Sequence, residues 1–91
     1  MWEPKSGKGK ASVIVTLAVL RSIGPTPLHS AARVIVEKRK AMGFPEGSRM
    51  IRNHIHYLLK EGLLEPLTVN GAIYLKVSEK GVGLLQSLFS P

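Results

Sequence analysis

The chain has 91 residues, 44% of them hydrophobic, and thirteen Lys and Arg against six acidic residues give a formal net charge of +7. This length suits one small domain whose core is barely large enough to be stable alone, which leaves dimerisation open. Cysteine is absent, which excludes disulfides, thiol catalysis and thiolate metal sites. The charge favours a polyanionic partner, with nucleic acid ahead of a merely soluble basic surface.

The first ten residues, MWEPKSGKGK, combine Pro, Gly, Ser and three lysines without apolar periodicity. We predict a flexible basic arm at residues 1–10 and one domain at residues 11–91. The arm would reach a minor groove or phosphates, or make no contact. The apolar run ASVIVTLAVL is too short to span a bilayer, and no signal-peptide cleavage site adjoins it. We therefore expect a cytoplasmic, nucleoid-associated protein.

Apolar side chains repeat at helical spacing over residues 11–23, and the following Gly-Pro pair supplies a cap and a stop. A β-strand competes there because Val and Ile dominate the start, but the length favours a helix. Thr26-Pro27 then indicates a cap and a first helical position, which predicts a second helix to about Met42. Its last turn, EKRK, places cations where they complement the helix dipole.

Ser48 predicts the N-cap of a third helix that runs to Glu61. Asn70-Gly71 lies between LLEPLTV and AIYLKV and is a strong hairpin signal, because a type I′ turn needs positive φ at both central positions. Ser78 is expected to cap a short final helix at residues 79–89, with an apolar stripe and two weakening glycines. The predicted order is three helices, a hairpin and a fourth helix.

The third predicted helix has two contrasting faces. At about 100° per residue, Ile51, Ile55, Leu58 and Leu59 fall on one side. Arg can bind guanine through two donors, Asn can pair with adenine, and Lys or His can meet phosphates. The same pattern also fits the solvated face of an ordinary amphipathic helix. The donors on the opposite arc are Arg49, Arg52, Asn53, His56 and Lys60.

The order of elements resembles the winged helix-turn-helix family, and the segments IHYLLKEGLLEPL and YLKVSEKG carry the likeness most specifically. Similar segments occur in MarR-, PadR- and ArsR-like regulators and in small archaeal and viral winged-helix proteins. The resemblance covers residues 11–90 and is strongest after position 48. It implies an α+β fold with a three-helix core, a short β-hairpin wing and a C-terminal helix.

By this resemblance, residues 26–42 form the supporting helix and residues 48–61 the recognition helix in the major groove. The implied function is sequence-specific binding of double-stranded DNA by a small transcriptional regulator. In similar regulators the terminal helices form a two-fold contact, so we expect a homodimer through residues 11–23 and 79–89. The expected DNA-binding residues are Arg49, Arg52, Asn53, His56, Lys60, Lys38, Arg39, Lys40 and Lys76.

Two features weaken the expected DNA contacts. The Asn70-Gly71 wing tip carries no Arg or Lys, unlike the family's pattern, which weakens the expectation of wing contacts. Glu46 lies in the link GFPEGS before the recognition helix. Its carboxylate would stabilise that helix N-terminus, or would weaken binding if it pointed at phosphates.

Other functions find little support in the sequence. His54 and His56 lie about 200° apart around a helix and His29 has no matched partner, so we expect no metal site and treat His54 as a flank residue. The chain has no Asp and no nucleophile beside a base, so we expect neither an enzyme nor a cofactor. Trp2 and Tyr57 are too few rings for a single-strand platform. A winged-helix module for protein–protein assembly and an RNA- or ribosome-associated basic protein remain alternatives.

Overall fold

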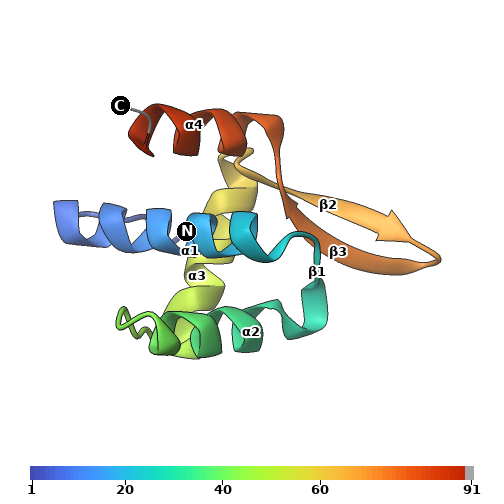
Figure 1. Cartoon of the computed structure of the whole chain (residues 1–91), viewed down its shortest axis with the longest axis horizontal. Coiled ribbons are helices and arrows are strands. Elements are labelled where there is room, and N and C mark those ends of the chain that lie inside the picture. Colours follow the sequence, from blue (N-terminus) through green and yellow to red (C-terminus); the bar gives the residue numbers. More distant parts are fainter. Residues whose placement is uncertain (90–91) are drawn as a thin grey trace.

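The computed structural model describes residues 1–89, which form four α-helices and one antiparallel sheet. Figure 1 shows α2, α1 and α4 in successive layers, α3 crossing behind α1, and a β-hairpin projecting from the helices. The helices are α1 (Gly7–Ile23), α2 (Leu28–Ala41), α3 (Ser48–Lys60) and α4 (Glu79–Phe89). The strands are β1 (Thr26–Pro27), β2 (Leu64–Val69) and β3 (Ala72–Val77), in the sheet order β1-β3-β2.

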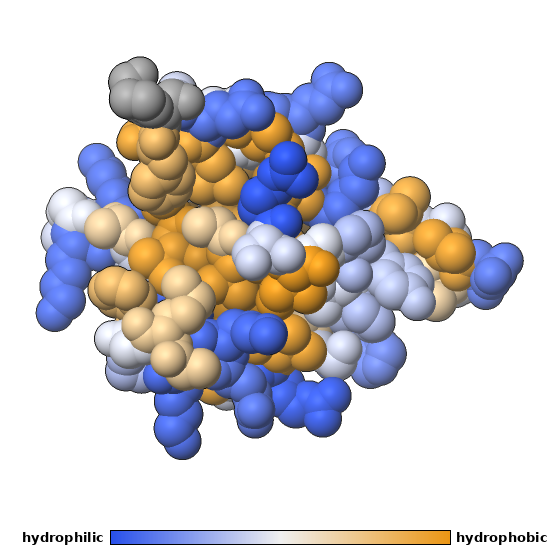
Figure 2. Space-filling view, viewed as in Figure 1, coloured by the Kyte–Doolittle hydropathy of each residue, from blue (hydrophilic) through white to orange (hydrophobic). Residues whose placement is uncertain are grey.

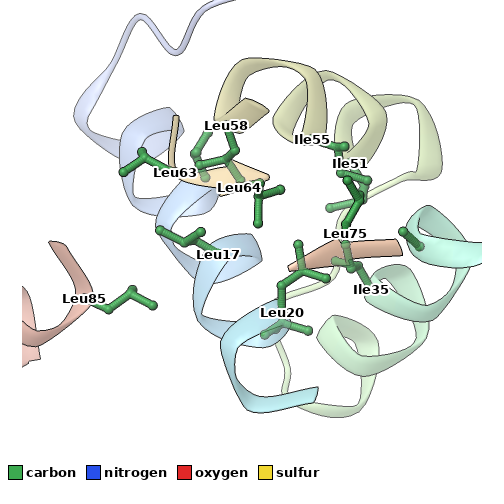
Figure 3. Packing of buried hydrophobic residues seen from close by; sticks show 13 residues of the cluster. Leu17, Leu20, Ile35, Ile51, Ile55, Leu58, Leu63, Leu64, Leu75 and Leu85 are labelled. Atoms are coloured by element: carbon green, nitrogen blue, oxygen red, sulfur yellow. The ribbon is translucent and has the colours of Figure 1, made fainter. Parts of the chain in front are cut away.

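The core lies where the three central helices meet β3 (Figure 3). Each fully buried Leu or Ile side chain contributes about 1.5–3 kcal/mol of transfer free energy, so apolar stripes on separate elements are drawn into one cluster. Among its fully buried members are Leu17 and Leu20 of α1, Ile35 of α2, Ile51 and Leu58 of α3, and Leu75 of β3.

Helix α1 begins at Gly7, inside the segment that we predicted as an arm. The Ser6 side chain accepts a hydrogen bond from the Gly9 amide at 3.0 Å and so caps the helix. Trp2, farther upstream, packs against the hydrophobic core. The helix therefore starts four residues earlier than the predicted position 11. The segment GKGK has no apolar periodicity that would predict a helix, but the Ser6 cap and the long apolar helix that follows stabilise a helical turn there.

The predicted role of Thr26 as a helix cap is wrong. Thr26 and Pro27 form the short strand β1, in which Thr26 pairs with Leu75 and Pro27 with Tyr74 of β3. The Thr26 hydroxyl donates to the Gly24 carbonyl at 2.9 Å instead of capping α2, which starts at Leu28 without a side-chain cap. Pairing with a strand almost fifty positions later decides this conformation.

The third helix matches its predicted span to within one residue, but its cap differs. Gly47 occupies the N-cap position, and no side chain accepts a hydrogen bond there. Ser48 is the first residue of α3 rather than its cap, and Glu61 is the C-cap. Gly62 follows with a φ of 73°, the left-handed conformation with which glycine commonly ends a helix.

The β2–β3 hairpin confirms the turn predicted at Asn70-Gly71. Both residues have positive φ, 50° and 80°, as a type I′ turn requires. Leu75 is buried at the base of the hairpin, whereas Val69 and Ile73 near the tip are exposed. Apolar alternation therefore continues along β3 beyond the point where the hairpin leaves the core.

Ser78 confirms the predicted cap of α4 and also joins α4 to the end of α3. Its Oγ accepts from the Gly81 amide at 3.1 Å and donates to the Gly62 carbonyl. Gly81 is buried directly against the Leu63 carbonyl and the Val77 side chain, where an added Cβ would overlap both. Gly83, two residues later, is exposed with open space around it.

These two glycines of α4 give a matched pair for a stability test. Gly81→Ala is expected to lower the free energy of unfolding by about 1–3 kcal/mol, because its Cβ forces backbone to move. Gly83→Ala is expected to raise it by about 0.5–1 kcal/mol, since alanine favours an exposed helical position. Urea unfolding followed by circular dichroism measures both values. Equal effects of the two changes would contradict the close packing at Gly81.

Candidate nucleic-acid interface

Helix α3 separates its apolar and basic residues as the sequence predicts. Ile51, Ile55 and Leu58 are buried in the core, and Leu59 is half-buried beside it. On the other side, Asn53 is half-buried and four basic side chains are exposed. A continuous donor surface therefore faces away from the core. The exposed basic residues are Arg49, Arg52, His56 and Lys60.

Helix α2 adds basic groups that the sequence analysis missed. His29 and Arg33 join Arg52 and His56 of α3 around one cleft of ≈ 350 Å³, whose lining also includes Ile55 and other apolar side chains. The sequence does indicate that His29 and Arg33 share one face of α2, because residues four apart on a helix lie on the same side. Their proximity to α3 depends on how the two helices pack.

Two of the predicted DNA-binding lysines form exposed ion pairs. Lys60 lies 3.4 Å from Glu3 Oε1, and Lys76 lies 3.3 Å from Glu65 Oε1 across the hairpin. Such exposed pairs contribute about 0–1 kcal/mol, so an incoming phosphate can exchange for the carboxylate. Lys76 sits well back from the neutral Asn70-Gly71 tip, near the base of the wing.

Arg39 is buried rather than exposed for contact with DNA, contrary to the sequence-based expectation. Its side chain is only 3% exposed and donates to backbone and hydroxyl oxygens of α1 and of the α2–α3 link. Its neighbours Lys38 and Lys40 are exposed, as expected. The run EKRK therefore contains two surface cations and one buried cation, because successive helix residues point about 100° apart.

His54 belongs to the core rather than to the flank of α3. It is 1% exposed, its Nδ1 lies 2.8 Å from Thr16 Oγ1, and its ring lies 5.2 Å from that of Trp2. Trp2 also meets Tyr57 edge-on at 6.0 Å between ring centroids. Burial first, and then the positive charge of Arg39, lower the pKa of His54 to about 4, while the Glu46 carboxylate acts in the opposite direction.

Glu46 points toward α1. Its Oε1 accepts a hydrogen bond from Ser12 Oγ at 3.3 Å, and the residue is half-buried. Ser12 Oγ also accepts from Arg39 Nη2 at 2.9 Å, so it links this carboxylate to the guanidinium. No acidic residue occupies the first turn of α3.

Within residues 1–89, no three His, Cys, Asp or Glu side chains are placed to hold a metal ion. His29 and His56 share the cleft described above, whereas His54 is buried on the other side of α3. No helix in the same part of the chain is long and apolar enough to cross a membrane.

The buried imidazole predicts a loss of stability in mild acid. Between pH 6.5 and pH 4 the unfolded chain protonates His54 while the folded chain does not, so the free energy of unfolding falls as pH falls. The loss attributable to this side chain is about 3 kcal/mol at pH 4. Urea unfolding from pH 7 to pH 4 should show a weaker pH dependence for His54→Gln than for the native chain. The exposed-site control His29→Gln should retain the native dependence, and an unchanged slope in His54→Gln would contradict the assignment.

Comparison with known proteins identifies the fold. No protein-family model and no curated protein sequence matches this chain. Among solved structures, the crystal structure of SSV1 F-93 aligns with a TM-score of 0.64 and 19% sequence identity, over 85% of this chain and 80% of that chain. With its helices, three-stranded antiparallel sheet and projecting hairpin, the chain has an α+β winged helix-turn-helix fold.

Proposed function

We propose that this protein binds double-stranded DNA sequence-specifically as a small transcriptional regulator, with α3 in the major groove. The supporting observation is the outward face of α3, where Arg52, Asn53 and His56 lie together beside Arg49. Arg and Asn supply the paired hydrogen bonds that distinguish guanine and adenine. The proposal is a binding function without a catalytic group or cofactor.

Phosphate contacts would come from the basic residues that flank α3. His29 and Arg33 of α2 share a cleft with Arg52 and His56, so one side of the recognition surface extends onto the supporting helix. Lys38 and Lys40 are exposed farther along α2. Cations of this kind release counterions from DNA and give affinity that falls with salt. The neutral wing tip has no cation to add.

We further propose that the protein acts as a homodimer through α1 and α4. Figure 2 shows apolar surface over these helices on the face turned to the viewer, whereas α3 crosses behind α1 in the same view (Figure 1). Leu84 is half-buried on α4, and Leu88 and Phe89 are 52% and 69% exposed. Contiguous exposed apolar surface of this kind is typical of a contact between protein chains.

The DNA-binding proposal predicts a large effect of changing the centre of α3. Arg52→Ala combined with Asn53→Ala should weaken binding to a duplex by about 30-fold or more, since each of the two lost base contacts costs about 1–3 kcal/mol. Fluorescence anisotropy across a salt series measures the affinity. Arg21→Ala removes the same formal charge from the exposed surface of α1 and should change the affinity far less.

Structured RNA as a competitor separates the alternatives in that titration. Preference for duplex DNA, with affinity that falls steeply as salt rises, supports the regulator proposal. Preference for structured RNA would favour an RNA-associated protein instead. Absence of duplex binding at low salt would refute the DNA-binding proposal and would favour the alternative of a protein–protein assembly module.

The dimer proposal predicts that a charge on the apolar side of α4 separates the chains. Leu88→Glu should shift the protein from dimer to monomer, because dimerisation would then bury an unpaired carboxylate. Analytical ultracentrifugation at micromolar concentration measures the change in mass. Gln86→Glu adds the same charge at another exposed position of α4 and should leave a dimer intact. A native chain that sediments as a monomer would contradict the proposal.

A further inference from the structure

The buried Arg39 guanidinium connects two helices and the link that leads into α3. Nε donates to the Phe44 carbonyl at 2.8 Å, and Nη1 donates to the Ser12 carbonyl at 2.7 Å and to Thr16 Oγ1 at 2.8 Å. Nη2 donates to Ser12 Oγ at 2.9 Å. These bonds use four of the five N–H groups of the side chain, so its orientation is fixed in three dimensions.

Thr16 extends this connection to α3. Because Arg39 has no acceptor atom, Thr16 Oγ1 accepts from it, and the Thr16 hydroxyl hydrogen is available to His54 Nδ1 at 2.8 Å. A chain of buried hydrogen bonds therefore runs from α2 through α1 to the back of the helix that carries Arg52 and Asn53. The junction consists of Arg39, Ser12, Thr16, His54 and the Phe44 carbonyl.

In the part of the chain that the structure describes, the Arg39 guanidinium is buried without a paired carboxylate. Burial lowers the pKa of the Arg39 guanidinium, and the Glu46 carboxylate opposes this effect. Within residues 1–89, no carboxylate oxygen lies within 4.0 Å of Arg39. A buried charge without an ion-pair partner is costly unless hydrogen bonds satisfy it, and the four bonds of Arg39 do so. Hydrogen bonds have a direction that apolar contacts lack, so this junction is suited to fixing geometry.

We propose that Arg39 is a positioning residue, which fixes the rotation of α3 and its link so that Arg52 and Asn53 face the base edges. The proposal rests on the proposed function. The core contacts of Ile51, Ile55 and Leu58 hold the apolar side of α3 against the rest of the fold, and the directional bonds of the junction restrict the smaller rotations that remain. Neighbouring residues lie about 100° apart around a helix, so a rotation by only a fraction of that angle would shift the base-reading side chains.

This role predicts a loss of specificity rather than a loss of charge-driven affinity. The test uses two duplexes, one enriched from a random-sequence pool by the native protein and one of the same composition in scrambled order. In Arg39→Met, the ratio of the two affinities should fall at least about tenfold, a difference of about 1.4 kcal/mol. The affinity for the scrambled duplex and its salt dependence should stay near native values, because Arg39 touches no phosphate.

Lys38→Met is the matched control, since it removes the same charge from the neighbouring exposed position. It should lower the slope of log affinity against log salt by about 0.9 while leaving the specificity ratio unchanged. If Arg39→Met lowers only the specificity ratio and Lys38→Met lowers only the salt slope, the positioning role of Arg39 is distinguished from a phosphate contact. Arg39→Lys should fail to restore specificity, because a single ammonium nitrogen cannot reach all the acceptors that the guanidinium fork joins.

Folding of each variant is checked by circular dichroism and urea unfolding before binding is measured. If Arg39→Met does not fold, Thr16→Val removes the link between Arg39 and His54 with little change in volume and should give the same loss of ratio. The positioning role would be overturned if a folded variant kept the native ratio of affinities for the enriched and scrambled duplexes. Lowering both affinities by the same factor leaves that ratio unchanged and would overturn it equally. If the native protein enriches no sequence from the pool, the proposed function fails, and this inference fails with it.

Discussion

The packing of α3 against α1 and α2 is the contact on which the rest of this structure depends. Ile51, Ile55 and Leu58 give up water contact on one side of the helix, and each contributes about 1.5–3 kcal/mol to holding it there. The same contact leaves Arg52 and His56 exposed on the opposite side. One amphipathic helix thus supplies both a large part of the core and the proposed recognition surface.

Burial separates basic residues that look equivalent in the sequence. Arg39 lies between two exposed lysines but is enclosed by α1 and the α2–α3 link, where its guanidinium satisfies four oxygen contacts. His54 is similarly enclosed between Thr16 and Trp2, whereas His56 is exposed. Lysine would be a poorer occupant of the Arg39 position, because its ammonium group is more strongly hydrated and offers no planar fork. The formal net charge of the chain therefore overstates the positive charge at its surface.

Short polar contacts at the element ends fix how the winged helix is assembled. Thr26 ties the entrance of α2 to β3, and Ser78 ties the end of α3 to the start of α4. Gly81 allows α4 to approach the Leu63 carbonyl closely. The wing then projects from this base with a turn that Asn70 and Gly71 can adopt at little cost in strain. A small core is thus supplemented by contacts that are local in space but distant along the chain.

The order of elements, the span of α3, the hairpin turn and the Ser78 cap could all be predicted from the sequence, because each depends on periodicity or on side chains within a few residues. The same local pattern placed Arg49, Arg52, Asn53 and His56 on one helical face. Only the tertiary structure decided that Thr26 joins a sheet, that Arg39 is buried and that His29 and Arg33 lie beside α3. Those outcomes depend on which distant segment covers a side chain, and neither helical period nor capping preference contains that information.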